Sequence, residues 1–220
     1  MDERFLSAIP LFSGCTPEEI GEMLRCLSAS RCVYGRGETI LQAGQEAEAM
    51  GIVLSGCVQL ELDDVWGRRS IIGQAGPGDV FAETYACAPG ARLMVSAVAA
   101  QKSEILFLNA SRLLHTCPTA CPYHTRLIQN LLAVTAQKSL ALSRRILHTS
   151  QRSIREKLLS YLSYEANLQG MRDFCIPFNR QQLADYLSVD RSALSAEMSR
   201  MKRDGLIDYE HSRFILRTQA

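Results

Sequence analysis

The feature that most limits the fold is a stretch of 26 residues, from Tyr123 to His148, that contains neither glycine nor proline. Because those two residues are the strongest helix breakers, the stretch predicts one helix of roughly 39 Å at 1.5 Å per residue. Residues at alternating four- and three-residue steps form a seam along it, as in a coiled coil. The seam consists of Ile128, Leu132, Thr135, Ser139, Leu142 and Ile146.

A second apolar stripe, made of Leu127, Leu131 and Val134, lies beside the seam. A helix that is apolar on two faces needs two partners. We expect the second stripe to pack on the chain's own amino-terminal part and the seam to pack on a second copy in a homodimer. A helix buried in one large core is the alternative, and the polar Thr135 and Ser139 in the seam argue against it.

The chain before this helix has the pattern of a β-domain. From Ser30 to Leu108, short runs of β-branched and aliphatic residues alternate with glycine-containing turns, which predicts a β-sandwich or small barrel. A short helix over residues 17–29 precedes it. Thr16 is its expected N-cap, Pro17 occupies its first position, and Glu19 completes a capping box.

The last 70 residues predict three helices and a β-hairpin. The helices cover Ile154–Asn167, Arg180–Leu187 and Arg191–Arg203, and Asn179 and Asp190 are the expected N-caps of the last two. Phe174–Phe178 is strand-like. Leu206–Tyr209 and Phe214–Arg217 form the hairpin, a small wing.

Two short helices joined by the turn Ser188–Asp190 predict a helix-turn-helix, a DNA-binding motif. The start of its second helix would present Arg191, Ser192 and Ser195 to the major groove, where short polar side chains and arginine read base edges. Asn179 and Arg180, at a helix start, suit phosphate anchoring. The candidate DNA-binding residues are Asn179, Arg180, Gln181, Arg191, Ser192, Ser195 and Arg200.

The charge distribution supports a polyanionic partner. The net charge of +1 divides into −6 over residues 1–110 and +7 over residues 111–220. A hydrophobic share of 47% with 21% charged residues is typical of globular domains. No apolar run reaches the roughly 18 residues of a membrane helix, and Met1–Arg4 has no signal-peptide character, so we expect a cytoplasmic protein without a membrane partner.

Over nearly its whole length the chain resembles the Crp/Fnr family of bacterial transcription regulators. The motifs that carry the resemblance are Gly37-Glu38, Gly44, Gly56, the segment Pro77–Glu83, the long helix and the helix-turn-helix with its wing. The resemblance implies an α+β fold: a double-stranded β-helix (jelly-roll) sensory domain over 1–122, a dimerisation helix over 123–149 and a winged helix-turn-helix domain over 150–220. It also implies a homodimer on a near-palindromic promoter site, with half-sites about 34 Å apart.

The resemblance places an effector pocket at Phe81, Ala82, Glu83, Thr84, Arg92 and Met94, together with Lys138 and Ser139 of the long helix. In the branch that senses cyclic AMP, a Glu is followed about ten residues later by Arg-Ser/Thr-Ala, which holds the cyclic phosphate. This chain keeps Glu83 but has Leu93-Met94-Val95 at that register, with Arg92 one position early and therefore on the opposite face of a strand. A buried phosphate without its arginine is uncompensated. We expect a small-molecule or redox effector other than cyclic AMP, and no cofactor is assigned.

The eight cysteines occur singly, and we expect reduced, mostly buried thiols. Cys15, Cys26 and Cys32 are too dispersed for the iron–sulfur ligands of the family's oxygen-sensing branch. Before the long helix, Cys117, Cys121 and His124 are weak candidates for a metal or redox site. The alternative is a proline-bounded turn whose thiols are small buried hydrophobes.

Two other classes of function are alternatives. A cupin-like barrel enzyme needs inward histidines, but all four histidines fall outside the strand region, and no hydrolase triad or phosphate loop is present, so we expect no enzyme. An interaction module that only dimerises is the other alternative. RNA polymerase is a further partner if the protein activates transcription, and the sequence leaves activation or repression, the effector and the promoters open.

Overall fold

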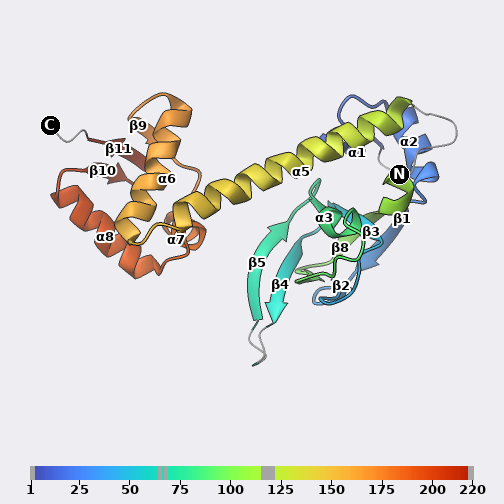
Figure 1. Ribbon diagram of the computed structural model, residues 1–220, viewed down its shortest axis with the longest axis horizontal. Coiled ribbons are helices and arrows are strands. Elements are labelled where there is room, and N and C mark those ends of the chain that lie inside the picture. The colour runs from blue at the N-terminus through green and yellow to red at the C-terminus, as the bar shows by residue number, and fades with distance from the viewer. Residues whose placement is uncertain (1–2, 64–65, 67–68, 115–121, 218–220) are drawn as a thin grey trace. The chain divides into compact units, whose positions relative to one another are not determined.

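The computed structural model describes residues 3–63, 66, 69–114 and 122–217. The chain divides into two compact units, Met1–Ala136 and Gln137–Ala220, and each is described by itself. Figure 1 shows their elements. The fold mixes helices and antiparallel sheets, so the predicted α+β class is confirmed.

The amino-terminal unit starts with three short helical segments, α1 (Glu3–Ser7), η1 (Pro10–Phe12) and α2 (Pro17–Cys26). The predicted capping box is present at α2. The Glu19 amide donates to Thr16 Oγ1 over 3.3 Å, and the Thr16 amide donates to Glu19 Oε2 over 2.9 Å. The helix ends earlier than predicted, because Ser28 turns into the left-handed region with φ of +49°.

Two four-stranded antiparallel sheets follow, with orders β1-β8-β3-β6 and β2-β7-β4-β5. Their inner faces enclose buried aliphatic and aromatic side chains, an arrangement typical of a jelly roll. The strands are β1 (Ser30–Tyr34), β2 (Thr39–Leu41), β3 (Ala49–Ser55), β4 (Val58–Asp63), β5 (Arg69–Ala75), β6 (Val80–Phe81), β7 (Ser96–Ala99) and β8 (Ser103–Asn109).

Gly56, in the turn between β3 and β4, is required by its surroundings. Its φ is +91°, and a Cβ there would lie 2.3 Å from Ser103 Oγ and 2.6 Å from the Lys102 carbonyl oxygen. Only glycine allows this close approach between the β3–β4 turn and the start of β8.

Two short helices, α3 (Glu83–Ala86) and α4 (Ala110–Leu114), precede the long helix α5 (Pro122–Thr149). The predicted long helix is confirmed, with one more residue at each end. Its first half belongs to the amino-terminal unit, where Leu127 and Leu131 are buried in the core with α1 and α2. The side-chain amide of Asn130 fixes this packing by donating from Nδ2 to the carbonyl oxygens of Leu11 and Ser13 over 3.0 and 2.9 Å.

The carboxy-terminal unit contains α6 (Ile154–Gln169), α7 (Arg180–Leu187) and α8 (Arg191–Arg203), with a three-stranded sheet of order β10-β11-β9. These strands are β9 (Asp173–Cys175), β10 (Ile207–Glu210) and β11 (Arg213–Leu216). The predicted strand over 174–178 is only three residues long, Asp173–Cys175. It ends before Pro177, which has no amide hydrogen to donate to a ladder. Buried side chains of all three helices form the core of this unit.

Candidate nucleic-acid interface

The helix-turn-helix is formed by α7 and α8. Apolar residues of both helices meet in the core of the carboxy-terminal unit: Leu183, Ala184, Leu187, Leu194, Met198 and Met201, all at most 1% exposed. Between the helices, Ser188 adopts the left-handed conformation with φ of +53°, and the Val189 amide donates to the Ala184 carbonyl over 3.0 Å. The turn therefore closes α7 and redirects the chain into α8 within three residues.

Both helices have the N-caps that the sequence predicts. Asn179 Oδ1 accepts from the Gln182 amide over 2.9 Å, and Asp190 Oδ1 accepts from the Ala193 amide over 2.9 Å. The Ser192 hydroxyl also donates to Asp190. These bonds, the Ser192 bond first, lower the pKa of the Asp190 carboxyl. The caps fix the first turn of α8, the turn that carries Arg191 and Ser192.

The exposed face of α8 carries two serines and an alanine, with an arginine at its end. Ser192, Ala196, Ser199 and Arg203 are all exposed and follow one another at helical spacing. Ser195, at the edge of this face, is half-buried, and its hydroxyl donates to the Arg191 carbonyl over 2.9 Å. A helix with such short side chains can approach a groove closely.

A groove of about 640 Å³ opens where the starts of α7 and α8 face the wing. Its lining includes Asn179, Arg180, Arg191, Ser195 and, from the turn between β10 and β11, His211. His211 has φ of +52°, so the turn presents it in a conformation that few residues adopt. Two cations, a histidine and two helix starts therefore face one open space, which suits a phosphate backbone.

Arg180 is the more enclosed of the two cations in this groove. Its guanidinium lies 5.0 Å from the centre of the Tyr209 ring. Burial lowers the pKa of Arg180, the neighbouring Tyr209 raises it in part, and repulsion from Arg191 lowers it. The two positive charges are thus close enough to disfavour each other, and an anion in the groove relieves that repulsion.

Several other cations of this unit are already paired with carboxylates. Arg155 of α6 binds Glu197 Oε1 and Asp204 Oδ2 at 2.7 Å each, and Arg200 lies 3.3 Å from Glu197 Oε2. Lys202 pairs with Asp208, and Arg213 donates from Nε and Nη2 to the two carboxylate oxygens of Asp173. By contrast, Arg191 and Arg203 form no ion pair with any residue that the structure describes.

The predicted DNA-binding residues therefore divide between the groove and its surroundings. Asn179, Arg180, Arg191 and Ser195 line one groove, Ser192 lies beside it, and Gln181 donates to Asp185 on the exposed side of α7. Arg200 lies at the edge of α8, bound to Glu197. Sequence reasoning missed His211. Its only signal was a His-Ser pair inside a hairpin whose flanking residues alternate between apolar and polar.

The predicted seam of α5 is exposed. Ile128, Leu132, Leu142 and Ile146 are 42, 70, 62 and 64% exposed, whereas Leu127 and Leu131 on the neighbouring face are buried. Thr135 donates to the Leu131 carbonyl over 2.7 Å, and Ser139 is exposed. A folded chain rarely exposes four large aliphatic side chains along one stripe of a helix.

The predicted effector residues of the amino-terminal unit divide between interior and surface. Phe81 and Glu83 are buried, Ala82 has φ of +59°, and Thr84 is exposed. Leu93 is buried, while Arg92 is exposed, forms an isolated antiparallel β-bridge with Glu46 through its backbone, and donates from its side chain to the Gly44 carbonyl over 3.3 Å.

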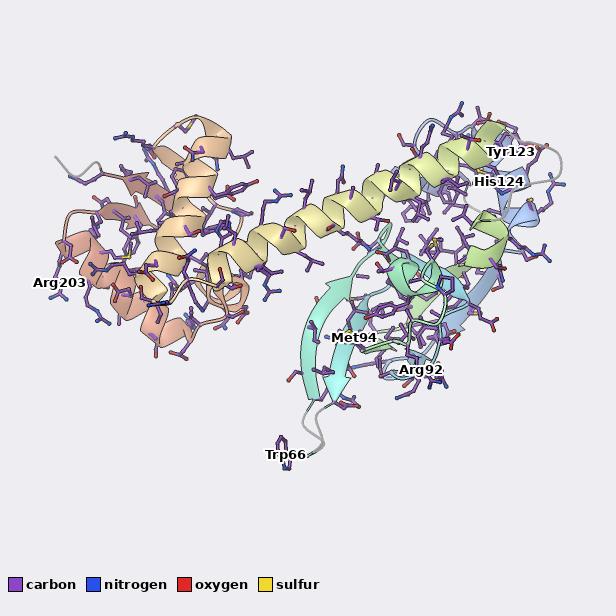
Figure 2. All side chains as sticks on the ribbon, viewed as in Figure 1. Trp66, Arg92, Met94, Tyr123, His124 and Arg203 are labelled. Atoms are coloured by element: carbon purple, nitrogen blue, oxygen red, sulfur yellow. The ribbon has the colours of Figure 1, made fainter. Side chains whose placement is uncertain are left out.

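Met94 is 73% exposed, and Figure 2 labels both Arg92 and Met94 on this unit. The segment is not part of β7, which starts at Ser96, so the expectation of a regular strand at Arg92 is wrong, although Arg92 and Leu93 do differ in burial as predicted. Lys138 and Ser139 are exposed residues of the other unit.

Of the predicted metal or redox candidates, Cys117 and Cys121 lie outside the described residues. His124, labelled at the start of α5 in Figure 2, is buried, and neither of its ring nitrogens has a hydrogen-bond partner among the residues that the structure describes. Within the described ranges, no cluster of three or more metal-ligating side chains occurs.

A sheet-built amino-terminal domain followed by a long helix and a winged helix-turn-helix defines a DNA-binding transcription regulator with a sensory domain. Comparison with known families agrees. Residues 31–119 match the model of the cyclic nucleotide-binding domain, and residues 156–220 match that of the Crp-like helix-turn-helix domain. The chain belongs to the Crp/Fnr family of transcription regulators.

Individual relatives agree with this assignment. The chain is 25% identical to the transcriptional activator protein FnrL of Cereibacter sphaeroides over 194 residues, which are 84% of this chain and 75% of that protein. It is 34% identical to the cyclic AMP receptor protein of Thermus thermophilus over 99 residues, 45% of this chain and 44% of that protein. The structure of CprK complexed with OCPA has a TM-score of 0.63 at 16% identity over 89% of this chain and 91% of that one, a likeness of fold.

In the described part of the chain, no helix has the length and apolar character required to cross a membrane.

Proposed function

We propose that the chain regulates transcription as a homodimer that binds a near-palindromic promoter site, with each α8 in a major groove. The observation that carries the proposal is the groove between α7, α8 and the wing, where Arg180 and Arg191 face one open space. The exposed aliphatic seam of α5 supports the dimer, because burying it against its own copy removes four large side chains per protomer from water.

Each candidate residue takes a role from its position. Asn179, Arg180 and His211 anchor the phosphate backbone, and Gln181 and Arg200 add contacts at the rim of the interface. Arg191, Ser192 and Ser195 read base edges, with Ser199 and Arg203 extending the same face of α8. Two such helices would occupy successive major grooves about 34 Å apart.

The effector is proposed to be a small molecule other than cyclic AMP. It would contact Phe81, Ala82, Glu83, Thr84, Arg92 or Met94, with Lys138 and Ser139 contributed by α5. Leu93 is buried at the register where the cyclic-AMP-sensing branch has its arginine, and the neighbouring Arg92 binds the Gly44 carbonyl instead. A cyclic phosphate in this domain would therefore lack a buried cation.

The remaining properties follow from this role. The proposed binding target is promoter DNA, so we place the protein in the cytoplasm. This role requires no enzymatic activity. RNA polymerase is a further partner if the bound dimer activates transcription.

Selection from a randomised duplex pool tests the proposal. Wild-type protein should enrich a two-fold symmetric site. Arg191→Ala should lower the preference for that site over random DNA by about 1–3 kcal/mol, because one base-reading side chain is lost. Arg180→Ala should weaken binding to both DNAs alike, because a phosphate contact carries no sequence information. An enriched sequence without symmetry, or equal losses in both variants on both DNAs, would refute these assignments.

A metal- or redox-sensing regulator is the second candidate. It is favoured by His124, a buried imidazole with both nitrogens unpaired within the described part of the chain, since burying such a group without partners is costly. Cys117 and Cys121 precede it in the sequence. Metal analysis of purified protein and of a His124→Asn variant, with thiol titration of both, tests this candidate. Metal-free wild-type protein whose DNA affinity is unchanged by oxidant rules this candidate out.

A further inference from the structure

The end of α7 is held by cations that come from other helices. Arg145 of α5 donates from Nε to the Tyr186 carbonyl over 3.2 Å and from Nη2 to the Asp185 carbonyl over 3.1 Å. Lys157 of α6 donates to the Leu187 carbonyl over 3.4 Å. Three consecutive carbonyls of the last turn of α7 therefore receive positively charged donors.

These contacts matter because the last carbonyls of a helix have no partners within it and carry partial negative charge. The last turn of α7 contains no basic residue of its own. The compensating charge is supplied across a helix–helix contact, and the planar guanidinium of Arg145 fixes the geometry of two bonds at once. Its carbon Cζ also lies 5.9 Å from the centre of the Tyr186 ring.

A second contact anchors the same stretch of α5 on α6. Buried His148 has Nδ1 2.8 Å from Ser160 Oγ, and its ring packs edge-on against Tyr161 with centroids 5.8 Å apart. One helical turn earlier, Arg144 donates to the Tyr164 hydroxyl over 2.7 Å. The end of α5 is thus fixed on both α6 and α7 within one compact unit.

The seam runs along the same stretch of α5 and next to Arg145, since three residues place Leu142 about 60° around the helix from Arg145. Leu142 and Ile146 are 62 and 64% exposed, while Arg145, the residue before Ile146, faces α7. One turn of α5 therefore carries both the surface proposed to meet the second protomer and the side chain that holds the helix-turn-helix.

We propose that Arg145 is a positioning residue for DNA recognition: by binding the end of α7, it sets the orientation of the helix-turn-helix relative to the dimer seam. The inference rests on the proposed dimeric DNA binding. Arg145 does not contact DNA in this scheme. It determines whether both recognition helices of the dimer reach their half-sites together.

The test uses the full-length chain and the symmetric duplex that wild-type protein enriches from a random pool. Affinity is measured for that duplex, for a duplex with one half-site, and for duplexes with half-sites one base pair closer or further apart. Arg145→Ala should lose about tenfold on the symmetric duplex, from the loss of charge-assisted bonds, and should lose the preference for the wild-type spacing. Its affinity for the single half-site should stay nearly unchanged.

Two further variants make the test decisive. Arg152→Ala removes the same charge from an exposed position, so it should weaken binding slightly and equally on every duplex. Arg145→Lys keeps the charge but loses the planar fork, and should show the pattern of Arg145→Ala in weaker form. It also decides the matter if Arg145→Ala fails to fold.

Equal losses on the symmetric and half-site duplexes, or an unchanged spacing preference, would overturn the positioning role while leaving the proposed function intact. If wild-type protein enriches no duplex at all, the proposed function itself fails, and the positioning role fails with it.

Discussion

Replacing one leucine of the seam with a charged residue should dissociate the proposed dimer. Leu142 is 62% exposed in the single chain. Full burial of a leucine contributes about 1.5–3 kcal/mol, so burying the exposed part of Leu142 contributes about 1–2 kcal/mol in each protomer. A symmetric interface contains this residue twice. Leu142→Asp should therefore weaken association by about 3 kcal/mol, roughly a hundredfold, before repulsion between the two introduced carboxylates is counted.

Sedimentation equilibrium over a range of protein concentrations measures this change. Leu147→Asp is the matched control, since Leu147 is 56% exposed on the same helix but lies about 140° around it from Leu142. The control should remain a dimer. The seam assignment is refuted if Leu142→Asp associates as strongly as the wild type, or if both variants dissociate equally.

Two other perturbations have outcomes set by the structure. Gly56→Ala should lower the free energy of unfolding by about 3 kcal/mol or more, because the added Cβ would collide with backbone atoms of Lys102 and Ser103. Gly37→Ala should lower it by only about 1 kcal/mol, because Gly37 has φ of +82° but no atom within 4 Å of the added Cβ. Urea unfolding measures both changes. Burial, with the charge of Arg144 adding, lowers the pKa of His148, so the unfolded chain binds the proton more readily. Stability should therefore fall as pH drops below about 6.5, and less steeply in His148→Gln.

Each of these has a contradicting result. Equal costs at Gly56 and Gly37 would mean that the β3–β4 turn relaxes away from β8. Parallel pH profiles for the wild type and His148→Gln would mean that His148 is free to take up a proton in the folded chain.

The sequence predicted those elements whose signals are local. The capping residues Thr16, Asn179 and Asp190 sit within three residues of their bonding partners, so the helix starts could be read directly. The seam and the buried stripe of α5 also follow from spacing alone, and the structure leaves Leu132 exposed and Leu131 buried.

Contacts between residues distant in the sequence could not be predicted in this way. Arg145 and Asp185 are 40 residues apart, and nothing in the local pattern distinguishes Arg145 from the neighbouring Arg144. Glu197 of α8 likewise receives Arg155 from α6, 42 residues away, in addition to Arg200 three residues along its own helix. Pairing across helices decides which cations remain available to DNA.

The mass of the complex between wild-type protein and its enriched symmetric duplex tests the central claim most directly. Native mass spectrometry should find two 24.4 kDa chains on each duplex, and no species with a single chain at concentrations where the free protein is a dimer. A complex with one chain per duplex, or no complex with any duplex at low salt, would contradict the account.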